Sequence, residues 1–397
     1  MRAALLLSAA LLTAAPAHAQ VNDQLQLRDT TSITDVEVGS AYDVGATAVA
    51  SGNAVTAVAD DADAQFGNTQ HMDGDANAAA NATVWNAGGT IAITSAALGN
   101  GGTADVSNSD VEIDSTQLAH GDANASVTFT GGNAMDAATS ASASGNTAAV
   151  SAENSDLRFL SNQESTGSLS AATQADHGSV GHQVVSGAIA SANNLTVGGE
   201  TATVLTDTRQ TATGDSVSAS VDLYAGYATD ASGNATANAN AVTIDNQWGY
   251  VNARIDQSST ANVNADSFVT LGGDFIGFAS SGAYGVGNQA IVSNVGSDTV
   301  MDVTQANAGD ISANAAMSGE GGQMALASSA AYGNSISGAL CAYCDNNVPS
   351  LTPTSSQTND GDVTSTATVR TPYATTVAAT STAIGNAATY SVAGPGG

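Results

Sequence analysis

Apolar and polar residues alternate along most of the chain, so that every second position carries a small apolar side chain. One run reads Ala76, Ala78, Ala80, Ala82 and Val84, and similar runs return throughout the sequence. Alternation with a period of two is typical of a β-strand that buries one face. Glycine, asparagine and aspartate, which favour turns, separate the runs. The pattern predicts an all-β protein built from many similar strands.

The runs belong to a repeat of about 47 residues. Glutamines recur at intervals of 46 to 52 residues from Gln24 to Gln357, and Gly-Asp usually follows four and five residues later. An asparagine, usually preceded by glycine, lies 17 residues before each glutamine from Gln70 to Gln305. A fixed period of this size marks a repeat architecture. The predicted structural corners of the repeat are Gln70, Gly74, Asp75, Gln117, Gly121, Asp122, Gln210, Gly214, Asp215, Gln305, Gly309, Asp310, Gln357, Gly361 and Asp362, with Asn53, Asn100, Asn146, Asn288 and Asn334.

This period predicts a repetitive β-solenoid (β-helix) of about eight 47-residue repeats. In extended conformation one repeat would span about 155 Å, which is long for a single narrow coil. Two coils per repeat, turning at the Gly-Asn and Gly-Asp positions, fit a narrow solenoid better, since these residues tolerate left-handed backbone conformations. About sixteen coils would then form a rod about 75 Å long.

The expected interior is thin and partly polar. A column of alanines recurs at the repeat period, at Ala50, Ala97, Ala143, Ala190 and Ala237. Small residues suit walls that nearly touch, and stacked asparagine and glutamine side chains form hydrogen-bonded ladders along such an axis. A β-propeller is the competing repeat architecture, because four short strands also fit the period. The alanine-rich interior favours the solenoid.

The N-terminal segment has the features of a secretory signal. Arg2 precedes the apolar stretch 3–15, and Ala17-His18-Ala19 is a small-residue cleavage site. No later apolar run approaches the roughly 18 residues that span a bilayer, so we expect an exported protein without a membrane span. The expected boundaries are 1–19 for the signal peptide, 20–45 for an N-terminal cap or first partial repeat, 46–390 for the solenoid repeats with a cysteine-containing insert at 339–354, and 391–397 for a flexible tail.

Composition and charge favour a disordered chain, whereas the repeat favours a folded one. The chain has no lysine and a net charge of −30, with few large aliphatic residues, which by the usual rule indicates disorder. A disordered chain has no reason to keep its register over many repeats, so we expect a folded protein. The acidic charge excludes nucleic acid as a partner, because phosphate would be repelled.

The candidate chemical groups have structural interpretations. Cys341 and Cys344 form either a redox pair, half of a metal site or a disulfide-closed loop, and export favours the disulfide. The Gly-Asp aspartates could hold calcium, but with two coils per repeat they would lie two coils apart, so we interpret them as solvated turn residues. The histidines His71, His120, His177 and His182 do not form a repeated column and are interpreted as hydrophilic loop residues. We therefore predict no metal and no cofactor.

Catalysis is the main alternative to a structural role. A β-helix enzyme that cleaves acidic polysaccharide needs basic residues beside its acids, and the arginines lie at unrelated repeat positions. No nucleophile elbow or metalloprotease motif occurs either. Aromatic residues gather in clusters that either stack on sugars or pack at a seam, and the sequence leaves both interpretations open. These clusters are Tyr224 with Tyr227, Trp248 with Tyr250, and Phe275 with Phe278 and Tyr284.

In its signal peptide, lysine-free Ala/Gly/Ser/Thr/Asn composition, Gln-x-x-x-Gly-Asp corners and Cys-Ala-Tyr-Cys insert, the chain resembles the holdfast anchor protein D (HfaD-type) family of stalked alphaproteobacteria. The Gln/Asn spacing also resembles, more distantly, the curlin repeats of secreted amyloid fibres. The family resemblance covers nearly all of the chain after the signal.

The resemblance implies a non-catalytic cell-surface anchor or adhesin that helps to attach holdfast polysaccharide to the outer envelope. The implied partners are the polysaccharide and other envelope anchor proteins, with self-association as a further expectation and an outer-membrane-associated location. A repetitive rod suits this role, because many weak contacts along one face give avidity without a single tight site. A secreted β-helix enzyme and an amyloid-like surface fibre subunit remain the alternatives.

Overall fold

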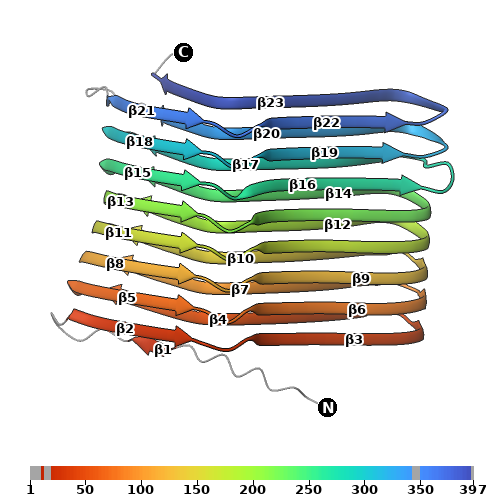
Figure 1. Ribbon diagram of the computed structural model, residues 1–397, viewed down its shortest axis with the longest axis horizontal. Coiled ribbons are helices and arrows are strands. Elements are labelled where there is room, and N and C mark those ends of the chain that lie inside the picture. The colour runs from red at the N-terminus through yellow and green to blue at the C-terminus, as the bar shows by residue number, and fades with distance from the viewer. Residues whose placement is uncertain (1–9, 13–18, 342–348, 395–397) are drawn as a thin grey trace.

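The computed structural model describes residues 10–12, 19–341 and 349–394, and in these residues it contains β-strands and no helix (Figure 1). The alternating pattern explains this, because the strands between the two end coils bury about every second side chain. The strands are β1 Ala10–Leu12, β2 Ala19–Gln26, β3 Thr30–Ala41, β4 Val44–Asp60, β5 Ala64–Met72, β6 Ala76–Ala87, β7 Thr90–Ser107, β8 Asp110–Ala119, β9 Ala123–Ala134, β10 Asp136–Glu153, β11 Asp156–Ser165, β12 Leu169–Glu200, β13 Thr203–Ala212, β14 Ser216–Gln247, β15 Val251–Ser259, β16 Asn262–Leu271, β17 Phe278–Val295, β18 Thr299–Asn307, β19 Ile311–Ser318, β20 Gly321–Cys341, β21 Leu351–Asn359, β22 Val363–Arg370 and β23 Tyr373–Ala393.

The strands form a β-solenoid in which every coil pairs in parallel with the next, so the predicted fold class is confirmed. The prediction of two coils per repeat is wrong. Gln70 pairs with Gln117, which pairs with Gln163, so one whole repeat separates neighbours in the sheet and forms one coil. Eight coils at about 4.8 Å per strand give a stack about 34 Å tall, half the expected height.

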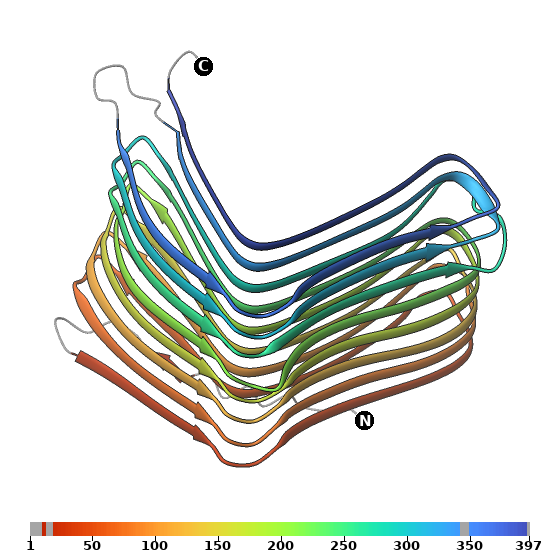
Figure 2. The same cartoon turned by 45° about the horizontal axis from the view of Figure 1, so that its top comes forward.

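The long coil fits because it is flattened and bent into a V (Figure 2). The inner layer, on the concave side, consists of long strands such as β7 and β10. The outer layer, on the convex side, consists of two shorter strands per coil, such as β8 followed by β9. We call the half of the V that contains β3, β6 and β9 arm A, and the half that contains β5, β8 and β11 arm B. The prediction of two coils per repeat assumed that each coil is narrow. The flattened coil of the structure takes up a whole repeat in a single turn.

The coils form two sheets, and the inner strands of both arms belong to the same one. The outer strands of arm B form an eight-stranded sheet in the order β2-β5-β8-β11-β13-β15-β18-β21. The remaining strands form a fifteen-stranded sheet, because β12 and β14 run around the rim of arm A from the outer layer into the inner layer. A register shift between Val180 and Gln183 marks this rim in β12.

Each arm has its own apolar core between the layers. The core of arm A is rich in alanine, and the predicted column at Ala50, Ala97, Ala143, Ala190 and Ala237 is buried there. The core of arm B uses larger residues, among them Phe66, Leu157 and Ile244. Small residues let the layers of arm A approach closely, as the sequence indicates.

The tight left-handed turns lie at the rim of arm B, not at the Gly-Asn and Gly-Asp positions. Asp61, Asn108 and Asn154 take positive φ there, as asparagine and aspartate readily do. Thr201 and Trp248 continue the same column with φ of 53° and 61°, although a β-branched and a bulky residue adopt this conformation rarely. The glutamine, Gly-Asp and Gly-Asn positions instead lie where the coil bends at the vertex of the V.

The two ends of the stack are open coils. Residues 20–45 supply β2, β3 and the start of β4, in register with the second coil. At the other end, β23 pairs with β20 as far as Ala393. Most of the predicted signal peptide and Cys344 of the insert lie outside the described residues, although β1 pairs with β4 at Val55–Ala57.

Candidate functional site

A glutamine ladder runs through the whole stack at the vertex, between the two layers. Each glutamine from Gln70 to Gln357 donates its side-chain amide to the side-chain oxygen of the glutamine one coil earlier, at 2.7–3.0 Å. The same nitrogen also donates across to a carbonyl of the inner layer, as Gln117 does to Thr147. These amides therefore join both successive coils and opposite layers.

An asparagine ladder on the inner layer completes the vertex. Asn53 donates to Asn100, which donates to Asn146, and the series continues to Asn386. Each asparagine nitrogen from Asn53 to Asn334 also donates to the carbonyl of the residue after a glutamine in the outer layer. Each ladder thus donates hydrogen bonds to backbone carbonyls of the opposite layer at the bend, and buried carbonyls need such partners.

The Gly-Asp positions form the outer bend. A Cβ on Gly121 would collide with the carbonyl of Gly74 in the preceding coil, and most other glycines of this column have the same clash. The aspartates accept a backbone N–H from the next coil, as Asp75 does from Asp122 at 2.9 Å. Successive aspartates therefore lie on neighbouring coils, and the expectation of a two-coil separation is wrong. Their bonds nevertheless match the turn role that the sequence suggested.

The inner layer has a solvent-facing surface on the concave side of the V, which we call the inner face. This inner face carries no charge over most of its width. The six columns that begin at Gly45, Thr47, Val49, Ser51, Ala54 and Thr56 run through all eight coils, and none of their residues is ionisable except tyrosine. Serine, threonine, asparagine, alanine and glycine dominate these columns. Acids return only towards the two rims, for example at Asp136 and Glu200. An uncharged face this broad is unexpected in a chain with a net charge of −30.

Two tyrosines lie on this inner face, beside the vertex. The rings of Tyr284 and Tyr332 are 5.9 Å apart and tilted by 51°. Gln289 donates a hydrogen bond to the Tyr284 hydroxyl at 3.0 Å. Burial raises the pKa of Tyr284 above its ordinary value, and Tyr332 adds to the rise while the Gln289 bond opposes it. Of the other predicted aromatic residues, Tyr224 is exposed on the outer layer, Trp248 lies at the rim turn of arm B and Phe275 is buried.

The outer face of arm B, by contrast, is charged. Arg158, Arg209 and Arg254 project from three consecutive strands, β11, β13 and β15, although their repeat positions look unrelated in the sequence. Arg158 pairs with Glu112 at 2.8 Å, and Arg254 lies 3.8 Å from Asp207. Both pairs are well exposed, so they contribute little to folding.

Three of the four histidines, His71, His177 and His182, lie in strands and not in loops as predicted. His71 and His120 come together on the outer face near the vertex, with Asp73 between them. His177 is buried in the core of arm A, stacked on Phe129 with ring centroids 4.4 Å apart. Burial lowers the pKa of His177 from 6.5 to about 4. His120 lies in the bend between β8 and β9, as expected of a loop residue, while His182 is an exposed residue of β12, 3.9 Å from Asp136.

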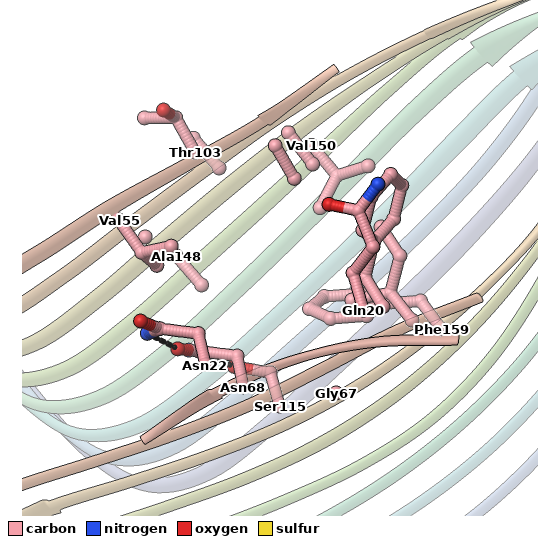
Figure 3. Close-up of a pocket in the computed structure, with 16 residues that line it drawn as sticks. Gln20, Asn22, Val55, Gly67, Asn68, Thr103, Ser115, Ala148, Val150 and Phe159 are labelled. Carbon is pink, nitrogen blue, oxygen red and sulfur yellow. Dashed lines mark hydrogen bonds between the residues drawn. The ribbon is translucent and has the colours of Figure 1, made fainter. Parts of the chain in front are cut away.

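A small cavity lies between the layers of arm B near the N-terminal end of the stack (Figure 3). Its volume is about 40 Å³, and its lining is largely apolar, with Phe159, Val55 and Val150 among its walls. Gln20 and Asn22 of the first coil border it, and Asn22 donates to Asn68 at 2.8 Å. The cavity has room for about one side-chain group, and not for a polymer.

The structural features already indicate a repetitive, non-globular scaffold with broad faces, and the family comparison fits that scaffold. The family model for holdfast attachment protein D (HfaD) matches residues 38–310. The chain belongs to the HfaD family. The predicted resemblance is therefore confirmed, and the family implies a role in holdfast attachment. No curated protein and no solved structure matches the chain. In the described part of this HfaD protein, no helix is long and apolar enough to cross a membrane.

Proposed function

We propose that this HfaD-family protein is a non-catalytic anchor that holds holdfast polysaccharide through its inner face. The observation that carries the proposal is the uncharged set of six columns, rich in hydroxyl and amide groups and repeated in every coil. A polymer laid along such a surface meets the same groups about every 4.8 Å, the spacing of paired strands. Many weak contacts of this kind add up to avidity.

The tyrosine pair supplies a local anchor within this face. Tyrosine rings stack on the apolar faces of sugar rings while the hydroxyl remains free to hydrogen-bond. Tyr284 is fixed by Gln289 and by its contact with Tyr332, so little conformational entropy is lost when a sugar binds. The concave side of the V also lets both arms contact the same chain of sugars.

The mechanical role follows from the stack. Force applied to a polymer on the inner face is shared by eight coils, which are joined by backbone pairing and by two amide ladders.

We further propose that the protein is exported and acts at the outer surface of the cell, where other envelope proteins link it to the membrane. The predicted signal peptide and the family membership support this location.

Substituting both tyrosines tests the proposal in cells. A strain carrying Tyr284→Ala with Tyr332→Ala at normal protein levels should shed more holdfast material into the medium than the parent strain. Tyr224→Ala is the matched control, because Tyr224 is an exposed tyrosine on the outer layer. Equal retention of holdfast by the double variant and the parent would contradict the role of the inner face.

A further inference from the structure

Two histidines and an aspartate converge on the outer face, where β5 and β8 approach the vertex. His71 is the penultimate residue of β5 and Asp73 follows that strand, while His120 follows β8 on the next coil. Asp73 Oδ1 lies 2.8 Å from His71 Nε2 and 3.2 Å from His120 Nδ1, and the two nitrogens are 3.0 Å apart. All three side chains reach solvent. Three possible ligand atoms are thus in mutual contact and accessible.

Their spacing is close to that of a zinc site. In a tetrahedral site with bonds of about 2.0–2.2 Å, ligand atoms lie about 3.3–3.5 Å apart, so small side-chain movements suffice. Two imidazoles and one carboxylate are a common ligand set for zinc and for similar borderline divalent ions.

The geometry points to a surface site for a divalent transition ion, with zinc as the best match, held by His71, Asp73 and His120. Water would complete the coordination. The ion would link the second coil of the stack to the third, because Asp73 and His120 share one column of adjacent coils, 47 residues apart. Binding would therefore raise the stability of the folded stack according to the ion concentration and affinity.

Titration of the chain from Gln20 onward with zinc chloride tests this site. Calorimetry should show one tightly bound ion, and the melting temperature should rise with zinc and fall back on adding a chelator. His71→Ala, His120→Ala and Asp73→Asn should each weaken binding at least tenfold. His182→Ala is the control, since its histidine faces a single aspartate, and it should leave the affinity unchanged within twofold. No stoichiometric binding, or an equal loss in the His182 variant, would overturn the proposal.

A separate observation concerns the two open ends of the stack. The last coil consists of β21, β22 and β23, and the first consists of β2, β3 and β4. Gln24 and Gln357, Thr30 and Val363, and Asn53 and Asn386 occupy the same three columns and are each 333 residues apart. Four of the six middle coils differ by one or two residues in the spacing from glutamine to asparagine, for example between Gln257 and Asn288. The two ends therefore match each other in all three strands without a register shift.

The matching columns are also complementary in charge and shape. Arg370 of the last coil shares its column with Glu37 of the first, so stacking two copies would pair the charges. Tyr390 shares its column with Ala57, which lines the small cavity that opens at the first coil. Apolar residues remain exposed at both ends, including Val21 and Val377. Open strand edges with these properties favour pairing with another edge.

We infer that a second copy of this chain docks on each end, head to tail, so that β2, β3 and β4 of one copy continue β21, β22 and β23 of the next. The glutamine and asparagine ladders would then pass from copy to copy. β1 occupies the position that Ala388–Tyr390 of the neighbour would take, and β1 lies in the predicted signal peptide. The docking therefore requires the chain without that segment.

A charge swap tests this docking in the chain from Gln20 onward. Analytical ultracentrifugation and electron microscopy of this chain should show particles that lengthen with concentration. Arg370→Glu would place two glutamates in one column and should raise the concentration needed for association at least fivefold. Glu37→Arg combined with Arg370→Glu should restore it to within twofold. A monomer at all concentrations, or a double variant as weak as the single one, would refute the arrangement; Arg158→Glu, away from both ends, is the control.

Discussion

The inner and outer layers of this protein are built from the same repeat, yet they present opposite surfaces. Inner strands such as β7 run unbroken along the coil, and their solvent-facing side chains include serine, threonine and alanine. The outer layer is broken at the Gly-Asp bend and carries most of the charged pairs and the histidine cluster. Since both layers bury similar small residues, the difference lies in what each layer offers to a partner. This difference supports the proposal that holdfast attachment uses the inner face, while the outer face carries the charge.

The largest expected effect comes from the glycines of the outer bend. Gly121→Val should destabilise the fold by about 3 kcal/mol or more, because the new side chain meets the backbone of Gly74. Chemical denaturation measures the loss. Gly187→Val on the inner face is the control, since no atom lies within 4 Å of its added Cβ. If both variants unfold at the same denaturant concentration, the bend does not require glycine.

The glutamine ladder that joins the layers should come next. Gln210→Leu removes its bonds to Gln163, Ala241 and Gln257, and should cost about 2–4 kcal/mol because buried partners are left unpaired. Gln174→Leu removes an exposed glutamine from the outer face and should change stability by less than about 0.5 kcal/mol. Denaturant midpoints of both variants measure this, and equal values would show that the ladder adds no stability.

A pH-dependent loss should follow from His177. Its pKa is about 4 in the folded chain and 6.5 when unfolded, so stability is complete above pH 6.5 and falls as pH decreases towards 4. The expected loss between pH 7 and pH 5 is about 2 kcal/mol. His177→Leu should remove this part of the pH dependence when both proteins are unfolded at each pH. An unchanged pH profile in the variant would place the sensitivity elsewhere.

The smallest effect is expected for the charges of the outer face. Arg158→Ala breaks an exposed pair with Glu112 and should alter the unfolding free energy by less than about 0.5 kcal/mol. Thermal denaturation at low and high salt is a suitable measurement. A loss above 1 kcal/mol would mean that the outer charges hold the coils together, contrary to the comparison of the two layers.

Much of the fold was predictable because burial has a simple signature. Alternating residues such as Ala76 and Ala78 identified the strands, and the recurrent Gln70 and Gln117 pointed to stacked amides. The number of coils per repeat was not predictable, because a period alone does not reveal how wide a coil is. The alternation from Leu169 to Ala175 places His177 on the buried face, but its stacking on Phe129 depends on packing that the pattern does not specify.

The candidate sites depend on the coil number, which explains why the sequence did not reveal them. With one coil per repeat, Asp73 and His120 are neighbours, whereas two coils per repeat would separate them. The uncharged inner face likewise appears only after the eight repeats are aligned in register. The exact period between Asp73 and His120 was the one signal that could have indicated the histidine cluster earlier.

The most direct test of attachment through the inner face compares two variants of the same arm. One variant carries a new negative charge on the inner layer and the other carries it on the outer layer. Ser142 lies on the inner face and Ser126 on the outer face of the same coil, and both are partly exposed serines. Binding of purified Ser142→Glu and Ser126→Glu proteins to isolated holdfast material should be compared with binding of the parent protein. We expect Ser142→Glu to bind at least fivefold more weakly and Ser126→Glu to bind normally. Normal binding by Ser142→Glu, or an equal loss in both proteins, would contradict attachment through the inner face.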